Sequence, residues 1–265
     1  VLGLANQGES CLAWDKKTGE PISQVIVWQD NRTANITNLL KNEGHEERVK
    51  ALSGLPLDPY FSASKLAWIL ANVPEAKELL REKRLALGTT DAFFIQNLIG
   101  RFVTDVTTAS RTSLMNLQTL EWDDELCNLF GVPKDTLPEI LATQDEFGEL
   151  KVKGLKIPLR ASVVDQQASL YGHGCRNVGD AKITLGTGAF ALVINGDSPE
   201  MNDPHGLLPT VAWRLGSEAP IFALDGGVYN AASALNWARG LGLFSEYLEI
   251  NTFEKPAAID RGLIF

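Results

Sequence analysis

Residues 162–170, Ser-Val-Val-Asp-Gln-Gln-Ala-Ser-Leu, mark the point where the pattern of the chain changes. The apolar residues before Asp165 predict a strand, and the residues that follow it predict a helix. Upstream, short strands are followed by helices, whereas downstream Ala181–Asn195 predicts a β-hairpin pinched at two glycines. This change of pattern predicts an α/β fold of two domains that meet near residues 165–185.

The segments upstream of this point combine strand and helix patterns. Apolar, β-branched runs predict strands over residues 1–6, 11–14 and 25–28. Helical spacing predicts helices over residues 33–52 with a break at Gly44, and over 62–73, 74–84, 90–98 and 123–130. Either Ser62 or Ser64 can cap the helix that begins there. Residues 144–162 contain two glycines and a proline, and they predict a hairpin or a connector.

The composition excludes several classes of protein. The 265 residues are 45% hydrophobic, which is enough to fill the core of one large or two ordinary domains. The 24 basic and 33 acidic residues give a net charge of −9, and a field of that sign disfavours nucleic acids and anionic membranes as partners. No apolar run approaches the ~18 residues of a membrane-spanning helix, and the three widely spaced cysteines fit a reducing compartment. We therefore expect a cytoplasmic protein.

Three short segments carry candidate chemistry. Asp165 follows a predicted strand and precedes a predicted helix, where a carboxylate can act as a general base, although capping the helix is the commoner role there. The glycines beside Thr187 let backbone N–H groups approach a phosphate, although the same residues also form ordinary β-turns. Asp225-Gly226-Gly227, before a predicted helix that ends near Gly240, offers the same two interpretations.

A further group combines aromatic rings with polar side chains. An aromatic face packs against the C–H face of a sugar or polyol, while carboxylates accept hydrogen bonds from its hydroxyls. Core packing is the commoner role of any single aromatic residue. The group consists of Glu9, Trp28, Gln29, Asp30, Asp58, Tyr60 and Phe190.

In their order along the chain, these segments resemble the FGGY family of carbohydrate kinases, and within it the glycerol kinases. The likeness covers nearly the whole chain with few gaps, which makes it far more specific than any single motif. The matching stretches are Asn6–Ser10, Ile26–Thr33, Asp58–Leu70, Gly88–Asp91, Thr104–Thr112, Trp122–Leu126, Asp165–Ala168 and Gly186–Phe190.

The resemblance implies an actin/hexokinase-like fold, with a ribonuclease-H-like core in each of two domains. Residues 1–173 would be the remainder of an N-terminal, substrate-binding domain, and residues 174–265 the beginning of a C-terminal, nucleotide-binding domain. The sequence would then be incomplete at both ends. The implied reaction is phosphorylation of a small polyol or sugar by ATP with Mg²⁺, and we expect the enzyme to be a homo-oligomer. No residue of the chain is assigned as a metal ligand.

By residue match, the resemblance also implies roles for individual side chains. Asp165 would be the base that accepts the proton of the substrate hydroxyl, and Gln166 would contact the substrate beside it. The residues that would line the polyol pocket are Glu9, Trp28, Tyr60 and Phe190. Gly186, Thr187 and Gly188 would contact the nucleotide phosphates. Ala232 and Asn236 fall where the family places a glycine and a glutamine near the nucleotide.

Two departures from the family pattern bear on the substrate. Glycerol kinases carry an arginine between the Gln and the Glu of the first motif, where this chain has Gly8. Loss of that arginine removes five N–H donors and opens space. Val164 stands where the family usually has a glycine before the catalytic aspartate. We therefore predict a substrate larger than glycerol, such as the four-carbon polyol erythritol.

Two other functions remain open from the sequence. A ketose kinase of the xylulose type shares the family pattern, although Trp28-Gln29-Asp30 and Asp58-Pro59-Tyr60 follow the glycerol-kinase form. A non-catalytic polyol-binding module would keep the pocket without phosphate transfer, because the sequence lacks the family's N-terminal Asp-x-Gly-Thr hairpin and its C-terminal adenosine segment. We predict that these 265 residues alone do not phosphorylate a substrate.

Overall fold

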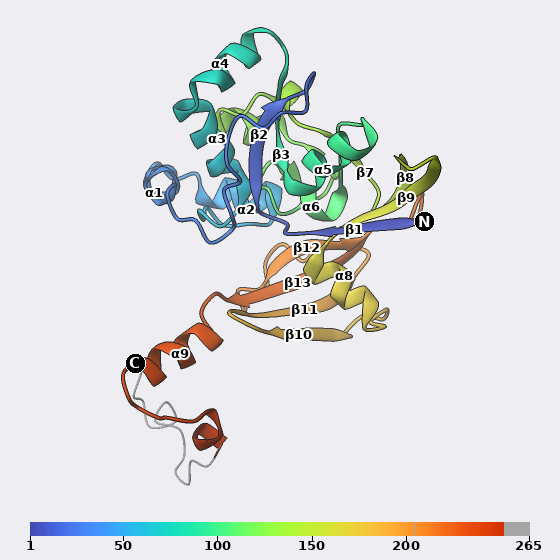
Figure 1. The fold of residues 1–265 in the computed structure, drawn as a ribbon. Coiled ribbons are helices and arrows are strands. Elements are labelled where there is room, and N and C mark those ends of the chain that lie inside the picture. Colours follow the sequence, from blue (N-terminus) through green and yellow to red (C-terminus); the bar gives the residue numbers. More distant parts are fainter. Residues whose placement is uncertain (204, 252–265) are drawn as a thin grey trace. The chain divides into compact units, whose positions relative to one another are not determined.

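Figure 1 shows the computed structural model of the chain, in which residues 1–203 and 205–251 are described. The chain divides into two compact units. Unit 1 comprises Val1–Lys182 and Ala191–Gly226, and unit 2 comprises Ile183–Phe190 and Gly227–Phe265. The end of the predicted second domain, residues 252–265, lies outside the described residues.

The strands are mostly short, and they pair in small sheets. The bounds are β1 Leu2–Asn6, β2 Cys11–Asp15, β3 Leu85–Thr89, β4 Val103–Asp105, β5 Met115–Asn116, β6 Glu121–Trp122, β7 Glu139–Leu141, β8 Gln144–Val152, β9 Leu155–Val164, β10 Ala181–Leu185, β11 Ala189–Gly196, β12 Leu208–Trp213 and β13 Ile221–Val228. The larger sheets have the strand orders β1-β9-β8 and β10-β11-β13-β12, and the pairs β2-β3, β4-β7 and β5-β6 complete the described set.

The helices of unit 1 follow the predicted positions closely. They are α1 Ala34–Asn42, α2 Glu46–Ser53, α3 Ser62–Asn72, α4 Pro74–Arg81, α5 Thr90–Ile99, α6 Val106–Ala109, α7 Asp124–Phe130, the 3-10 turn η1 Lys134–Thr136 and α8 Asp165–Gly172. The predicted break at Gly44 is confirmed, since this residue lies between α1 and α2 with a φ of 86°, a conformation that glycine adopts without strain. Unit 2 contains α9 Ala232–Gly240 and the 3-10 turn η2 Tyr247–Asn251.

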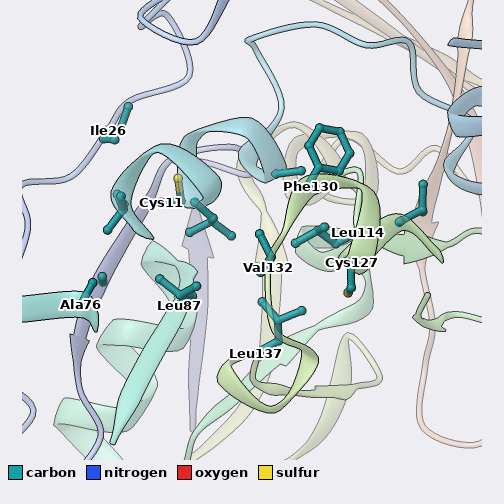
Figure 2. Packing of buried hydrophobic residues seen from close by; sticks show 14 of the residues in the cluster. Cys11, Ile26, Ala76, Leu87, Leu114, Cys127, Phe130, Val132 and Leu137 are labelled. Carbon is teal, nitrogen blue, oxygen red and sulfur yellow. The ribbon is translucent and has the colours of Figure 1, made fainter. Parts of the chain in front are cut away.

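A hydrophobic cluster in unit 1 packs β2 and β3 against helices (Figure 2). Cys11 and Ala13 of β2 and Leu87 of β3 are fully buried in it, and Phe130 of α7 packs in the same cluster. Every residue of β2 and of β3 is buried. Burial of both faces explains why these strands have continuous apolar runs instead of alternating patterns.

The predicted strand-to-helix junction at Asp165 is confirmed. β8 and β9 form an antiparallel hairpin, whose turn residues Lys153 and Gly154 have positive φ angles of 48° and 81°, as a type I′ turn requires. β1 pairs with β9 in parallel, with Asn6 opposite Val164. The segments that follow Asn6 and Val164 therefore leave from the same end of two neighbouring parallel strands, where ligand sites of α/β folds commonly lie.

The predicted strand over residues 25–28 is wrong. Ile26 alone of these residues pairs with a strand, through an isolated bridge to Cys11. Val25 and Val27 are exposed, and the Val27 carbonyl accepts a hydrogen bond from the N–H of Asp30, which turns the chain. The β-branched composition therefore does not reflect a strand buried in a sheet.

The predicted serine cap of α3 is also wrong. The N-cap residue is Phe61, and no side chain caps this end of α3. The Ser62 hydroxyl donates instead to the Glu9 carbonyl at 3.0 Å, and the Ser64 hydroxyl lies 2.8 Å from that of Thr33. Both serines therefore join α3 to other segments.

The predicted glycine hairpin is confirmed, and its tip, Ile183–Phe190, belongs to unit 2. The loop Gly186–Gly188 joins β10 to β11. The carbonyls of Gly186 and Thr187 accept hydrogen bonds from the N–H groups of Ala232 and Ala231 at 3.2 and 2.8 Å, which attaches the loop to the first turn of α9. A Cβ on Gly188 would lie 2.8 Å from the Val228 carbonyl oxygen, so this position requires glycine.

Candidate functional site

A buried ion-pair network joins three segments of unit 1. Arg111 follows α6, Glu9 lies in the turn after β1, and Asp225 lies in β13. Nε of Arg111 donates to Oε1 of Glu9 at 2.7 Å, and Nη2 donates to Oδ2 of Asp225 at 2.8 Å. The side chains of Arg111, Glu9 and Asp225 are only 5%, 7% and 14% exposed. One guanidinium therefore lies between two carboxylates with little access to water.

This network corrects the interpretation of Asp225-Gly226-Gly227 as a phosphate-binding turn. The three residues lie inside β13, and α9 begins only at Ala232. The segment therefore provides no helix N-terminus for a phosphate. The carboxylate of Asp225 is instead a partner of Arg111.

Burial and charge together set the ionisation of the network. Burial acts to lower the pKa of Arg111, but the charges of Asp225 and Glu9 raise it overall, so the guanidinium stays protonated. Burial raises the pKa of Glu9, while the positive charges of Arg111 and Lys65 oppose this shift. Removing one partner of such a pair costs about 3–5 kcal/mol, because it leaves an uncompensated buried charge.

Aromatic rings pack near the guanidinium of Arg111. Its Cζ atom lies 5.4 Å from the ring centre of Phe61 and 6.0 Å from that of Tyr60. Trp28 and Tyr60 are in edge-to-face contact, with ring centres 5.6 Å apart. Glu9, Trp28 and Tyr60, which the sequence pattern assigns to a polyol pocket, are therefore connected in one cluster. Rings beside charged hydrogen-bonding groups suit a ligand with C–H faces and hydroxyls.

Asp165 is the first residue of α8 and directly follows β9. The N-cap is Val164, so Asp165 does not have the capping role. Asp165 is exposed to solvent, yet desolvation by the surrounding protein raises the pKa of its carboxyl, against the opposing effects of the Gln166 N–H and the Lys182 charge. Gln166 itself accepts a hydrogen bond from Nζ of Lys182 at 2.7 Å. A solvent-accessible carboxylate with a raised pKa is suited to accept a proton.

A buried hydroxyl network ties α6 to the strand that carries Asp165. Asp105 is the N-cap of α6 and accepts hydrogen bonds from both the N–H and the hydroxyl of Thr107. The hydroxyl oxygen of Thr107 also accepts from the backbone N–H of Val164 at 3.0 Å. Burial, followed by repulsion from Asp91, raises the pKa of Asp105 to about 6. The network therefore fixes the backbone immediately before Asp165.

Gly8 is buried against the same strand end. A Cβ at this position would lie 3.0 and 3.1 Å from the two Cγ atoms of Val164 and 3.2 Å from Cγ of Arg111. The two departures from the family pattern, at residues 8 and 164, are therefore neighbours in space. The side chains of Val164 and Arg111 fill the space that a side chain at residue 8 would enter.

We expect Gly8→Arg to destabilise the protein by about 1–3 kcal/mol, because inserting a side chain into a packed site displaces its neighbours. The cost should be smaller by about 1 kcal/mol or more when Val164→Gly is present, since the closest contacts are then gone. Urea unfolding of the two single variants and the double variant measures this coupling.

The control for these variants is Gly172→Arg, because a Cβ on Gly172 would meet no heavy atom within 4 Å. We expect that substitution to change stability by no more than about 0.5 kcal/mol. An equal cost of Gly8→Arg with valine and with glycine at residue 164 would show that the two positions are not coupled.

The residues assigned to the nucleotide lie together in unit 2. The loop Gly186–Gly188 is hydrogen-bonded to the start of α9, and Ala232 is the first residue of that helix. Asn236 follows one turn later, and its side-chain carbonyl accepts a hydrogen bond from the hydroxyl of Tyr247. Thr187 is exposed at the tip of the hairpin. Contact of these residues with a nucleotide stays a prediction.

Phe190, which the sequence pattern assigns to the polyol pocket, also belongs to unit 2. Its ring fills the space beside two glycines, since a Cβ on Gly188 or Gly227 would approach it to 2.8 or 2.9 Å. The placement of Phe190 in the pocket with Glu9 stays a prediction.

Residues 1–203 and 205–251 contain no group of three or more His, Cys, Asp or Glu side chains that could hold a metal ion. These residues therefore do not form a metal cage of their own. None of the helices in this part of the chain has the length and apolarity needed to cross a bilayer.

Two members of the ion-pair network, Arg111 and Asp225, are not predicted as site residues by the sequence pattern. Arg111 lies in the matched stretch Thr104–Thr112, and a buried arginine in such a stretch is a signal for a bound carboxylate. Asp225 was interpreted as part of a turn. Its pairing with Arg111, 114 positions away in the chain, could not be derived from local pattern.

Comparison with known protein families and curated sequences gives consistent matches. The model of the "FGGY family of carbohydrate kinases, N-terminal domain" matches residues 1–172. The glycerol kinase of Paraburkholderia phytofirmans is 42% identical over 268 residues, which cover 99% of this chain and 53% of that protein. The glycerol kinase of Burkholderia multivorans is also 42% identical, over 94% of this chain and 51% of that protein. The chain spans about half the length of these curated relatives.

Solved structures extend the comparison to the fold. Plasmodium falciparum glycerol kinase with ADP has a TM-score of 0.87 and 32% identity, covering 93% of this chain and 50% of that one. Xylulose kinase from Lactobacillus acidophilus has a TM-score of 0.73 and 25% identity, covering 90% and 49%. These similarities confirm the predicted α/β, actin/hexokinase-like fold. With a family model that matches residues 1–172 and relatives of the same kind across almost its whole length, the chain belongs to the FGGY family of carbohydrate kinases.

Proposed function

We propose that the protein to which this chain belongs transfers the γ-phosphoryl group of ATP to a hydroxyl of a small polyol. The observation that carries the proposal is the cluster of Glu9, Arg111, Trp28 and Tyr60 beside the strand end that leads to Asp165. The 42% identity to glycerol kinases supports the same substrate class. The ADP bound in the Plasmodium falciparum glycerol kinase structure supports ATP as the phosphate donor.

In the proposed reaction, Asp165 is the general base. The substrate oxygen forms a bond to the γ-phosphorus of ATP, and the bond from that phosphorus to the bridging oxygen of the β-phosphate breaks, which releases ADP. The proton of the substrate hydroxyl moves to the Asp165 carboxylate. The raised pKa of that carboxyl makes it a better proton acceptor than an ordinary aspartate. Gln166 would contact the substrate beside it.

The remaining roles divide between the two units. Glu9, Trp28 and Tyr60 of unit 1 and Phe190 of unit 2 would line the polyol pocket. The loop Gly186–Gly188 would contact the phosphates through backbone N–H groups and the Thr187 hydroxyl, as glycine-rich loops do. Ala232 and Asn236 would lie near the nucleotide.

We further propose that Mg²⁺ is held mainly by the nucleotide. This ion is commonly bound through substrate phosphates with only one or two carboxylates. We also retain the boundary between the two predicted domains at residues 173 and 174, and the family model, whose match ends at residue 172, supports it. The enzyme would act in the cytoplasm, as a homo-oligomer.

The substrate is predicted to be larger than glycerol. Gly8 leaves out the arginine that glycerol kinases carry, and with it the N–H donors that would hold a three-carbon polyol, which favours a substrate with a fourth carbon and a fourth hydroxyl. We expect kcat/KM for erythritol to exceed that for glycerol by about tenfold or more, the discrimination that one well-placed group provides. A coupled ADP-release assay of the whole protein with glycerol, erythritol, pentitols and ketoses measures this preference.

The same assay tests the proposed function itself. A highest rate on glycerol would remove the prediction of a larger substrate but leave the polyol kinase. A highest rate on a ketose would favour the sugar kinase, in line with the likeness to Lactobacillus acidophilus xylulose kinase. Binding of polyols without any ATP-dependent turnover would identify a non-catalytic polyol-binding protein.

A further inference from the structure

The guanidinium of Arg111 has a donor group without an acceptor. Its Nε and Nη2 atoms bind Glu9 and Asp225. Its Nη1 atom is buried and has no hydrogen-bond partner among the residues that the structure describes. A buried donor that stays unpaired costs about 1–3 kcal/mol. Native proteins therefore rarely keep one unless a ligand or a water molecule supplies the acceptor.

The charges around Arg111 restrict the chemistry of that acceptor. The guanidinium already lies between the carboxylates of Glu9 and Asp225, so an anionic ligand would place a third negative charge beside this guanidinium. A hydroxyl adds no charge, and its oxygen can accept from Nη1 while its proton is donated elsewhere. Two adjacent hydroxyls match an arginine and a glutamate side by side. The site therefore favours a vicinal diol over a phosphate or a carboxylate.

Gly8 connects this donor to the departure from the family pattern. A Cβ at residue 8 would lie 3.2 Å from Cγ of Arg111, so a side chain there would press on the aliphatic part of this arginine. The Phe61 and Tyr60 rings, with centres 5.4 and 6.0 Å from Cζ, pack near its guanidinium. Arg111 is therefore held in place by packing as well as by its two ion pairs, as a specificity-determining group must be.

We propose that Arg111 binds the polyol directly, with Nη1 donating a hydrogen bond to one hydroxyl while Glu9 accepts from the hydroxyl beside it. With glycine at residue 8, Arg111 is the guanidinium that we place against the polyol. The inference rests on the proposed polyol-kinase function and deepens it, because it names the residue that selects for one particular hydroxyl of the substrate.

The test combines changes in the protein with changes in the ligand. Isothermal titration calorimetry on the whole protein compares the affinity for erythritol with the affinity for its monodeoxy analogues, each of which lacks one hydroxyl. A hydrogen bond to a charged group accounts for about 10- to 100-fold in affinity. We expect the wild type to bind one of these analogues at least about tenfold more weakly than it binds erythritol.

In Arg111→Lys, the affinity for that same analogue should be less than about threefold below the affinity for erythritol, because an ammonium does not reproduce the fixed guanidinium geometry. The control is Arg48→Lys, which makes the same chemical change in an exposed ion pair with Glu125. This variant should keep the full discrimination of the wild type. A purely structural role of Arg111 would weaken binding of all the polyols equally.

A measurement on the wild type covers the case in which Arg111→Lys does not fold. The ¹⁵N-labelled guanidinium signal of Arg111 should shift when the protein is saturated with erythritol. Unchanged discrimination in Arg111→Lys, or an Arg111 signal that does not respond to bound erythritol, would overturn the inference while leaving the proposed function intact. Absence of polyol binding by the wild type would overturn both.

Discussion

We expect Asp165→Asn to lower the turnover of the proposed polyol phosphorylation by about 100-fold or more, because an amide cannot accept the proton of the attacking hydroxyl. The affinity for the polyol should change much less, since the proposed hydrogen bonds that Arg111 donates and Glu9 accepts remain. Asparagine has nearly the shape of aspartate, and Asp165 is exposed at the start of α8, so the variant should fold. Coupled ADP release for kcat and titration calorimetry for binding separate these effects.

The pH dependence supplies a second readout of the same group. Asp165 acts as a base only when its carboxyl is deprotonated, and desolvation raises the pKa of that carboxyl above its ordinary value. Turnover should therefore rise with pH through this raised pKa, and the acidic limb of the profile should disappear in Asp165→Asn. Asp124→Asn is the matched control, because Asp124 is likewise the first residue of a helix, α7, and is exposed. Full activity in Asp165→Asn would show that another group accepts the proton.

We expect Asp105→Asn to make the stability of the protein less dependent on pH, by about 2 kcal/mol between pH 4 and 6. The pKa of Asp105 is raised to about 6 in the folded protein, chiefly by burial, whereas an unfolded aspartate has a pKa of about 3.9. The folded state therefore binds the proton more tightly. The stabilisation by this proton is complete below pH 4 and is lost as the pH rises through 6.

Urea unfolding at a series of pH values tests this prediction. Asp105 caps the start of α6 and accepts a hydrogen bond from the N–H of Thr107. Asparagine is also a good N-cap residue, so Asp105→Asn keeps a hydrogen-bond acceptor at this position. As the pH increases, the unfolding free energy of the wild type should fall relative to that of the variant. Asp124→Asn, an exposed aspartate, should follow the wild type closely. A pH-independent difference for Asp105→Asn would mean that this carboxyl is not protonated preferentially in the folded state.

The local sequence pattern is sufficient to predict most of the helices and strands of unit 1. The glycines at 44, 54 and 131 all have positive φ at helix ends, as their positions after apolar helical runs predict. The Lys153-Gly154 turn and the junction at Asp165 likewise depend on neighbouring residues only. Residues 25–28 show the limit, because β-branched residues form a strand only where a partner strand covers them.

The candidate site could be predicted only where its residues carry a recognisable motif. Glu9, Trp28 and Tyr60 lie in matched stretches, and the structure connects them in one cluster. The ion pair from Arg111 to Asp225 joins distant segments. Such a pairing is a property of the tertiary fold and leaves no periodic signal in the sequence.

The contact between positions 8 and 164 shows the same limit. Both departures from the family pattern are visible in the sequence. That they touch follows only from the parallel pairing of β1 with β9, which brings Gly8 to the end of the strand that carries Val164. Two departures from the family pattern that are far apart in the sequence therefore lie next to each other in the structure.

A crystal structure of the whole protein with a polyol and ADP bound would test the proposed chemistry most directly. We predict that a carboxylate oxygen of Asp165 lies about 2.6–3.2 Å from a hydroxyl of the polyol, and that the loop around Thr187 contacts the phosphates of ADP. A polyol bound elsewhere, or an Asp165 carboxylate turned away from every substrate hydroxyl, would contradict the assignment of this residue as the base.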